Sequence, residues 1–446
     1  MSNQDKNQRN ILESKAELAE SKPRNEWGTF KDSLRAPVHN WFTYPAGFSY
    51  RAVEHFLNLH NVKPGKDVIY DPFMGSGTTN IAARQLGVDS LGNEAHPFVY
   101  EITLSKMEWE INDKSVRKFI EALSSTVVIP NETIVSKSNS NRFPELLHKC
   151  FLPPTLYALG EIRDQVKKSR LGKDEKRFLR TALICSLRDI SIAATGWPYI
   201  APKKIKITSM SKQPVETFQK RALRMLDELI LVRNSNPKPS NHDIRLGDSR
   251  STTFDTSSAK YLFTSPPYLN NFDYSDRTRL EMYFMGDALT WGDISDQVRT
   301  KLMTSATTQI SRNNPRYVLN SEIQKTAPNV FDFLSTSIES LGELRLTKGG
   351  KKSYDLMVGG YFNDIYDILS DNRRILKSGG RASYILGDSA PYGVHIPTDE
   401  LIGKLGLAVG FSEYKIEILR ERGGKWAANP QRHSVPLRES IVHFLT

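Results

Sequence analysis

Residues 67–94 read DVIYDPFMGSGTTNIAARQLGVDSLGNE, and this stretch decides the fold. A β-rich apolar run leads into a turn that contains Gly75 and Gly77, and an alanine-containing segment typical of a helix follows. Glycine lets the backbone bend tightly against a ligand, and the next helix begins with unsatisfied N–H groups aimed at it. A second short strand, 89–92, leads to Glu94, whose carboxylate is placed to accept hydrogen bonds from two ribose hydroxyls. The stretch therefore predicts a cradle for a nucleotide cofactor.

The glycine turn by itself leaves a second interpretation open, namely a tight strand-to-helix connection that merely needs small residues. Two absences narrow the choice of ligand. The G-x-G-x-x-G spacing of dinucleotide sites is missing, and no Lys-Ser/Thr pair closes the turn as in a P-loop. A second motif far downstream, Thr264-Ser265-Pro266-Pro267-Tyr268, supplies the decisive information.

DPFMGSGTT at 71–79, followed at a distance by TSPPY at 264–268, resembles the S-adenosylmethionine-dependent amino-methyltransferases of DNA. The serine form of the second motif resembles the cytosine-N4 branch of that family. The resemblance runs from about His39 to Phe444, apart from an internal stretch. It implies an α/β fold with the Rossmann-like sheet of class I methyltransferases, mostly parallel with an antiparallel last strand, interrupted by a large helical insertion.

S-adenosylmethionine is the cofactor that the resemblance implies. The aromatic segment 39–48 would close over its methionine end through Phe48, although aromatic residues at this spacing also suit core packing. The family commonly has Lys before this Phe, whereas Gly47 stands here. Asp248 would accept from the adenine amine, with a Gly-Asp turn as the alternative. The predicted cofactor-binding residues are Phe48, Asp71, Pro72, Phe73, Gly75, Ser76, Gly77, Thr78, Thr79, Glu94 and Asp248.

The predicted catalytic residues are Ser265, Pro266, Pro267 and Tyr268. The exocyclic amine of a base is a poor nucleophile because its lone pair is delocalised into the ring. A serine hydroxyl and a proline carbonyl can both accept the amino hydrogens and favour a pyramidal nitrogen. The Tyr268 ring would give an extruded base a face on which to stack. No metal is implied. Asp273 is a candidate for contact with the amine, and a helix cap is the equal alternative.

Double-stranded DNA with its target base flipped out is the predicted partner, because a base inside a duplex is unreachable. The formal net charge of +11 agrees with a polyanionic partner, although a solvated basic surface gives the same number. A mixture of aromatic and basic residues in the helical part is the candidate DNA contact, with an ordinary charged face as the alternative. It comprises Trp197, Tyr199, Lys203, Lys204 and Lys206.

The chain of 446 residues is divided by pattern into four parts. Residues 1–26 read as a solvated arm with a short helix at 11–21, and residues 27–102 as the first part of the methyltransferase domain. Residues 103–240 read as a helical insertion and the preferred target-recognition region, with helices expected at 115–125, 154–169, 174–194 and 215–233. Residues 241–446 read as the second part, which contains a non-repetitive region at about 270–352.

No run of eighteen apolar residues exists, and the two cysteines are too few for a disulfide framework or a zinc site. We therefore expect a cytoplasmic protein without membrane contact. The resemblance further implies a prokaryotic, nucleoid-associated enzyme with a cognate restriction endonuclease as a possible partner. Three other functions stay open. They are adenine-N6 methylation, action on RNA, and a DNA-binding subunit that keeps the fold without turnover.

Overall fold

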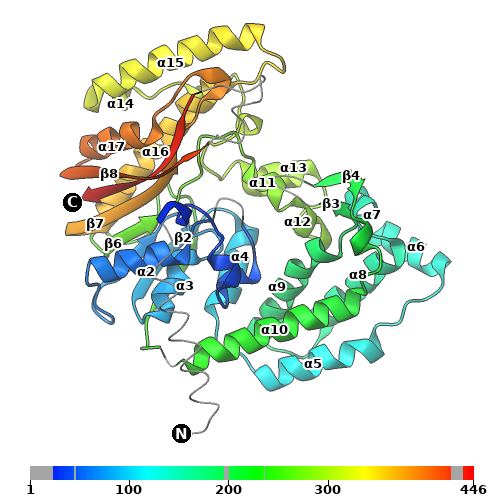
Figure 1. Ribbon diagram of the computed structural model, residues 1–446. Coiled ribbons are helices and arrows are strands. Elements are labelled where there is room, and N and C mark those ends of the chain that lie inside the picture. The colour runs from blue at the N-terminus through cyan, green and yellow to red at the C-terminus, as the bar shows by residue number, and fades with distance from the viewer. Residues whose placement is uncertain (1–23, 45–46, 195–199, 236, 423–434) are drawn as a thin grey trace.

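The computed structural model describes residues 24–44, 47–194, 200–235, 237–422 and 435–446. Its centre is a seven-stranded sheet in the order β5-β2-β1-β6-β7-β9-β8 (Figure 1). All neighbouring pairs are parallel except those that β9 makes with β7 and β8. The strands are β1 (Val68–Asp71), β2 (Asp89–Glu94), β5 (His242–Leu246), β6 (Ala259–Thr264), β7 (Leu376–Gly387), β8 (Glu413–Arg422) and β9 (Leu437–Leu445). The predicted fold class, a mostly parallel sheet with an antiparallel last strand, is confirmed.

Helices cover both faces of this sheet, as the alternation of side chains along the strands shows. Tyr70 and Val442 belong to a core cluster with helices α15 (Pro328–Thr347), α16 (Tyr354–Ile375) and α17 (Thr398–Ala408). Their chain neighbours Ile69 and Ile441 belong to another cluster, with α2 (Tyr50–Leu59) and α3 (Thr78–Gln85). Because both faces are covered, a central strand such as β6 (AKYLFT) has buried residues on both sides.

The strand order reverses at β1. From β1 the chain moves outward to β2 and β5, and it then returns to β6 on the other side of β1. In open parallel sheets the crevice outside the carboxyl ends of the strands at such a point is the usual ligand site. The loops that follow β1 and β6 carry the two sequence motifs, so the topology brings these motifs to adjacent strand ends.

A helical block connects β2 to β5 and lies beside the sheet (Figure 1). The helices expected at 115–125, 154–169 and 215–233 are confirmed within two residues as α5, α8 and α10, whereas the expected helix 174–194 ends at Ile190 because residues 193–194 pair as a strand. The block consists of α4 (Pro97–Met107), α5 (Asp113–Thr126), α6 (Glu132–Arg142), α7 (Glu145–Cys150), α8 (Pro153–Lys168), α9 (Lys173–Ile190), β3 (Ala193–Ala194), β4 (Ala201–Ile205) and α10 (Pro214–Asn234).

A second insertion separates β6 from α16. It contains α11 (Tyr274–Arg277), α12 (Arg279–Met285), α13 (Trp291–Ile294), α14 (Ser321–Thr326) and α15. The 20-residue helix α15 was not predicted from the sequence. Its buried stripe is narrow, with Val330, Leu334 and Leu341 interrupted by Ser337, so the helical period is weak among the surrounding polar residues.

Two points concern local structure. Residues 377–380, Lys-Ser-Gly-Gly, lie within β7, where Ala259 pairs with Leu376 and Tyr261 with Arg381, so the extra β7 residues bulge out of the ladder. Gly379 has a φ of +68° there, a backbone conformation that glycine adopts without strain. The helix expected at 11–21 lies outside the described residues.

Candidate functional site

The turn after β1 takes the shape that its glycines allow. Gly75 and Gly77 have φ values of +51° and +86°, which non-glycine residues adopt only with strain. A Cβ atom added to Gly77 would lie 2.9 Å from the Thr103 Cγ2 on α4. Below the turn, the buried Lys106 donates to the carbonyl of Ser76 over 2.8 Å. The turn is therefore held close to α4, and its N–H groups precede α3.

Glu94 at the end of β2 reaches the same turn. Its carboxylate accepts from the backbone N–H of Gly75 at 2.9 Å and from that of His96 at 2.8 Å. Only 8% of the residue is exposed, and burial raises the pKa of this carboxyl to about 7. Two backbone donors fix the orientation of the carboxylate, and further acceptor positions are left for a ligand.

The motif loops after β1 and β6 are joined to each other by side chains. The fully buried Asp71 accepts from the Thr264 hydroxyl at 2.6 Å and from the N–H of Phe73 at 3.0 Å. The Thr79 hydroxyl donates to the carbonyl of Phe263 over 3.1 Å. Burial raises the pKa of Asp71 to about 6. These bonds couple the position of the glycine turn to that of the Ser-Pro-Pro-Tyr loop.

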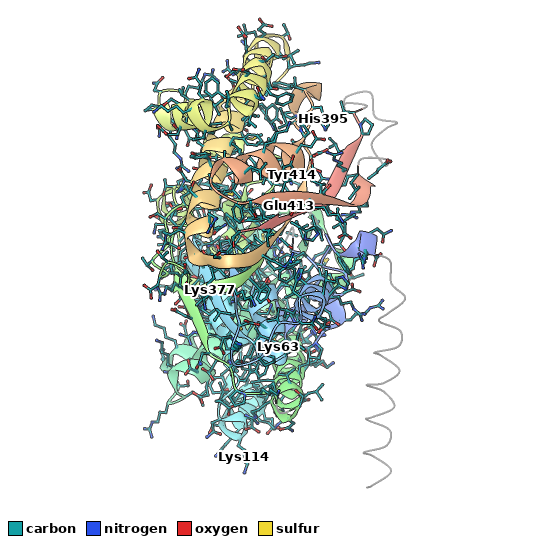
Figure 2. The ribbon with its side chains drawn as sticks, turned by 90° about the vertical axis from the view of Figure 1, so that its left-hand side faces the viewer. Lys63, Lys114, Lys377, His395, Glu413 and Tyr414 are labelled. Atoms are coloured by element: carbon teal, nitrogen blue, oxygen red, sulfur yellow. The ribbon has the colours of Figure 1, made fainter. Side chains whose placement is uncertain are left out.

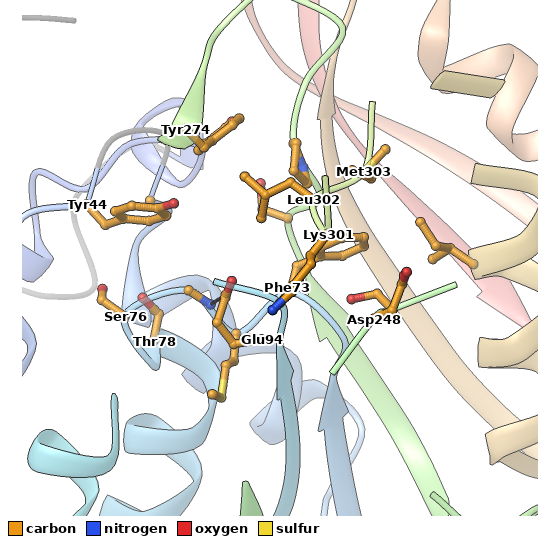
Figure 3. Close-up of a pocket in the computed structure, with 18 of the residues that line it drawn as sticks. Tyr44, Phe73, Ser76, Thr78, Glu94, Asp248, Tyr274, Lys301, Leu302 and Met303 are labelled. Carbon is orange, nitrogen blue, oxygen red and sulfur yellow. Dashed lines mark hydrogen bonds between the residues drawn. The ribbon is translucent and has the colours of Figure 1, made fainter. Parts of the chain in front are cut away.

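A cavity that is partly open to solvent lies between these loops. Figure 3 shows Ser76 and Thr78 on one side of it, Asp248 on the other, and Glu94 and Phe73 between them. Nine predicted site residues line the cavity: Phe48, Phe73, Gly75, Ser76, Thr78, Glu94, Asp248, Ser265 and Pro267. Six are not part of its lining: Asp71, Pro72, Gly77, Thr79, Pro266 and Tyr268. Of these, Asp71 and Thr79 hold the two loops together.

Ser265 enters the cavity from the end of β6. Its hydroxyl donates to the carbonyl of Ile385 over 3.3 Å, which leaves the lone pairs of the hydroxyl oxygen to accept hydrogens. Tyr268 differs from expectation, because it is 6% exposed and its hydroxyl donates to Glu439 over 3.3 Å. The Arg422 guanidinium lies 5.5 Å from the centre of the Tyr268 ring. Tyr268 is thus buried and is not among the residues that line the cavity.

Two acidic candidates have polar partners. Asp248 accepts from Arg250, through the backbone N–H at 2.9 Å and through Nε at 2.9 Å, while it lines the cavity. Asp273 caps the short helix α11 and also accepts from Arg299 at 2.9 Å and from Thr308 at 2.8 Å. The helix-capping interpretation of Asp273 is therefore the one that the structure displays.

Sequence reasoning missed part of the lining. Tyr44 and Tyr274 bring aromatic rings, with centroids 6.0 Å apart, to the same cavity that Ser265 and Pro267 line. Tyr44 precedes Phe48 by four residues in the same aromatic run, so its spacing was a usable signal. The other missed residues are Gly47, Met74, Ala95, Ser249, Lys301, Leu302, Met303 and Ile368. Residues 301–303 come from the second insertion, for which the sequence offers no motif.

The predicted DNA contacts separate into two groups. Lys203 and Lys204 are exposed on β4, whereas Lys206 is half-buried and donates to the carbonyl of Arg188 over 2.8 Å. Trp197 and Tyr199 lie outside the described residues. Exposed lysines also occur on distant surfaces, as Lys114 and Lys377 illustrate (Figure 2), so position and not charge alone must define the interface.

The chemistry of the residues that line the cavity suits S-adenosylmethionine. A buried carboxylate (Glu94) suits ribose hydroxyls, a second carboxylate (Asp248) suits an exocyclic amine, and a glycine turn lets the backbone approach between them. Within the described ranges, no group of three or more His, Cys, Asp or Glu side chains is arranged to hold a metal ion. No helix in the described part of the chain has the length and apolarity needed to cross a membrane.

Comparisons with known proteins point the same way. A family model described as DNA methylase, covering N6 and N4 enzymes, matches residues 1–105. The type II methyltransferase M.BsoBI of Geobacillus stearothermophilus is 24% identical over 93% of this chain and 86% of its own length. M.AvaI of Nostoc is 23% identical over 88% of this chain and 82% of its own, and M.MvaI of Kocuria varians is 20% identical over 88% and 85%. The resemblance to the DNA amino-methyltransferases that was drawn from the motifs is confirmed, since this chain is similar to type II methyltransferases along most of its length.

Proposed function

We propose that the protein is an S-adenosylmethionine-dependent DNA methyltransferase that modifies the exocyclic amine of cytosine, at N4, as the modification enzyme of a restriction-modification system. One observation carries the proposal. Ser265 and Pro267 line the same cavity as Gly75 and Glu94, although nearly two hundred residues separate the two loops. The similarity to type II methyltransferases along most of the chain supports DNA as the substrate.

The cofactor side of the cavity is built for positioning. Glu94 is oriented by two backbone N–H groups and would accept the ribose hydroxyls, and Asp248 would accept from the adenine amine. Phe48 and the glycine turn would enclose the methionine end. S-adenosylmethionine, when bound, supplies an electrophilic methyl group on a sulfonium. The residues of this chain supply proximity and orientation toward it.

The residues on the catalytic side of the cavity would act on the exocyclic amine of the base, which is a weak nucleophile. The Ser265 hydroxyl donates a hydrogen bond to the carbonyl of Ile385, so its oxygen has lone pairs left to accept an amino hydrogen of the base. The Pro266 carbonyl offers the second acceptor. Together they draw the amine hydrogens out of the ring plane and release the nitrogen lone pair toward the donor. Tyr44 and Tyr274, in place of Tyr268, are the rings that would stack on the flipped base.

Target recognition is assigned in this proposal to the helical block, residues 103–240. Its exposed Lys203 and Lys204 suit phosphate contacts, because Lys and Arg gain affinity by releasing counterions from DNA. The partners of the proposal are thus duplex DNA and, as in systems of this type, a cognate endonuclease.

The test is methylation with a deuterated methyl donor, followed by digestion of the DNA and mass spectrometry of its nucleosides. We expect labelled N4-methylcytosine, formed about 100-fold more slowly by the Ser265→Ala variant. Labelled N6-methyladenine would replace the cytosine assignment with the adenine alternative. Donor binding without any label in DNA or RNA would favour a non-catalytic DNA-binding subunit.

A further inference from the structure

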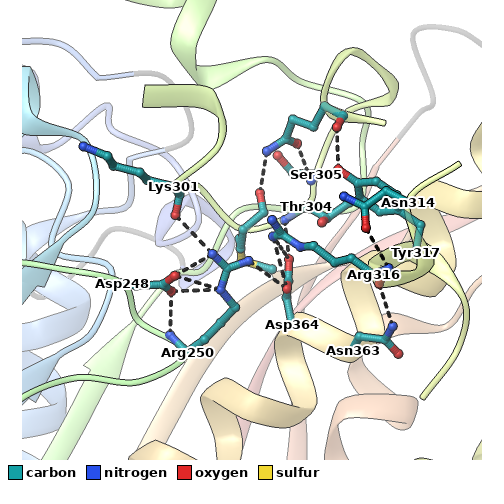
Figure 4. A network of polar contacts seen from close by, with 12 residues as sticks. Asp248, Arg250, Lys301, Thr304, Ser305, Asn314, Arg316, Tyr317, Asn363 and Asp364 are labelled. Atoms are coloured by element: carbon teal, nitrogen blue, oxygen red, sulfur yellow. Dashed lines mark hydrogen bonds and ion pairs between the residues drawn. The ribbon is translucent and has the colours of Figure 1, made fainter. Parts of the chain in front are cut away.

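A network of charged side chains borders the cofactor side of the cavity (Figure 4). Its centre is Asp364 on α16, which is 3% exposed. The Asp364 carboxylate accepts from Arg250 Nη1 at 3.0 Å and from Arg316 Nη2 at 3.0 Å. It also accepts from the backbone N–H of Thr304 at 2.7 Å. One buried carboxylate therefore joins the loop after β5 to two separate parts of the second insertion.

Arg250 is the link between this centre and the cavity. While Nη1 contacts Asp364, Nε of the same guanidinium donates to Asp248 at 2.9 and 3.0 Å. The planar guanidinium holds its donors in a fixed fork, so the Asp248 carboxylate is oriented relative to Asp364. Arg250 also donates to the carbonyl of Lys301 over 3.5 Å.

Residues 301–303 form the wall of the cavity that the second insertion supplies, and the Lys301 side chain points into the cavity (Figure 3). This wall is held at both ends, at the Lys301 carbonyl by Arg250 and at the Thr304 N–H by Asp364. Ile368, one turn beyond Asp364 on α16, lines the same cavity. The network therefore fixes the positions of Asp248 and of residues 301–303, which line the same cavity.

Buried ion networks cost desolvation energy and are weak evidence for stability in themselves. This one contains two guanidinium groups and two carboxylates, so its charges balance. We propose that Asp364 and Arg250 are positioning residues for the adenosine half of the cofactor, holding Asp248 and the 301–303 wall in the binding geometry. The inference rests on the proposed function, because it names the residues that shape the site for that cofactor.

The experiment compares the binding of two ligands by calorimetry. S-adenosylhomocysteine carries both halves of the cofactor, and 5′-methylthioadenosine carries only the adenosine half. We expect Asp364→Asn to weaken both by about the same factor, on the order of tenfold or more, because a guanidinium loses its charged partner. The KM for S-adenosylmethionine should rise accordingly, with kcat changed far less.

Asp355→Asn is the matched control. Asp355 lies on the same helix, is buried, and pairs with Arg312 of the same insertion at 2.9 Å, but neither residue lines the cavity. Its loss should leave both affinities within about twofold of the parent protein. Equal effects of Asp355→Asn and Asp364→Asn would show a general structural role and overturn the proposal.

Thermal unfolding will show whether Asp364→Asn folds. If it does not, the Arg250→Lys variant tests the proposal instead. Lysine keeps the charge but cannot bridge two carboxylates with a planar fork, so both ligands should again bind more weakly. Unchanged affinities in folded Arg250→Lys would overturn the inference and leave the proposed function intact. If the parent protein binds neither ligand, the proposed function itself fails.

Discussion

Replacing Glu94 by Gln tests the cofactor site most sensitively. The carboxylate accepts from the N–H groups of Gly75 and His96 at 2.9 and 2.8 Å, and it would accept two ribose hydroxyls as well. An amide keeps one acceptor oxygen and turns an NH₂ group toward one of these donors. Hydrogen bonds to charged groups contribute about 1.5–3 kcal/mol each. A loss of about 3 kcal/mol predicts roughly 100-fold weaker binding of S-adenosylhomocysteine at pH 8.

The pH dependence of binding sharpens this prediction. Burial raises the pKa of Glu94 to about 7 in the free protein, and hydroxyl donors from a bound ribose favour the charged form and lower the pKa again. Below pH 7 a proton must therefore leave when the ligand binds. Affinity should rise with pH up to about 7 and then level off, by at most about 100-fold if the bound pKa is two units lower. Glu94→Gln should show no such rise.

The raised pKa of Glu94 also makes the free energy of unfolding depend on pH, and this quantity falls over the pH range in which the ligand affinity rises. Because the folded-state pKa of Glu94 lies above the ordinary value of 4.5, the folded ligand-free protein holds the proton more tightly than the unfolded chain. The contribution to the free energy of unfolding is present below pH 4.5 and is lost as the pH rises to about 7.

Titration calorimetry at pH 5.5, 7 and 8.5, in two buffers with different ionisation enthalpies, measures both the affinity and the protons released. Thermal unfolding of each sample confirms that the variant is folded. If the affinities of Glu94→Gln and the parent protein rise in parallel with pH, another group is responsible and the role given to Glu94 is wrong.

Three other variants probe the rest of the site. Ser265→Ala should lower kcat by about 100-fold and leave S-adenosylhomocysteine affinity unchanged, as single-turnover methylation and calorimetry would show; a normal kcat would contradict its role. Gly77→Ala should lower the free energy of unfolding by about 2 kcal/mol, because the φ of Gly77 is +86° and an added Cβ atom would lie close to the Thr103 side chain. Denaturant unfolding measures this free energy, and an unchanged midpoint would show that alanine is not strained at this position. Changing Lys203 and Lys204 together to Ala should reduce the slope of log affinity for DNA against log salt by about two; an unchanged slope would exclude both from the interface.

The motifs predicted the site where local chemistry determines geometry. The glycine turn, Glu94 at the end of β2 and Ser265 at the end of β6 all follow from short patterns at strand ends. Parallel pairing of β1 with both β2 and β6 then brings them together. The mostly parallel sheet with an antiparallel last strand could be expected from the resemblance to class I methyltransferases, whereas the order of the strands was not predicted.

Other features depend on packing between distant segments. The two prolines fix the backbone before Tyr268, but the direction of its ring is set by Glu439 and Arg422, more than 150 residues away. The 301–303 wall is placed by Asp364 and Arg250, and no short sequence pattern signals such a contact. Asp71 could be found as a site residue from its motif, but its bond to Thr264 appears only in the folded sheet.

A crystal structure with the unreactive cofactor analogue sinefungin and a duplex containing the target base would examine the shared cavity itself. We expect the adenosine between Glu94 and Asp248, and the amine of a flipped cytosine between the Ser265 hydroxyl and the Pro266 carbonyl. Sinefungin bound away from the glycine turn, or a flipped base that does not approach Ser265, would contradict the proposal that the two motif loops form one methyl-transfer site.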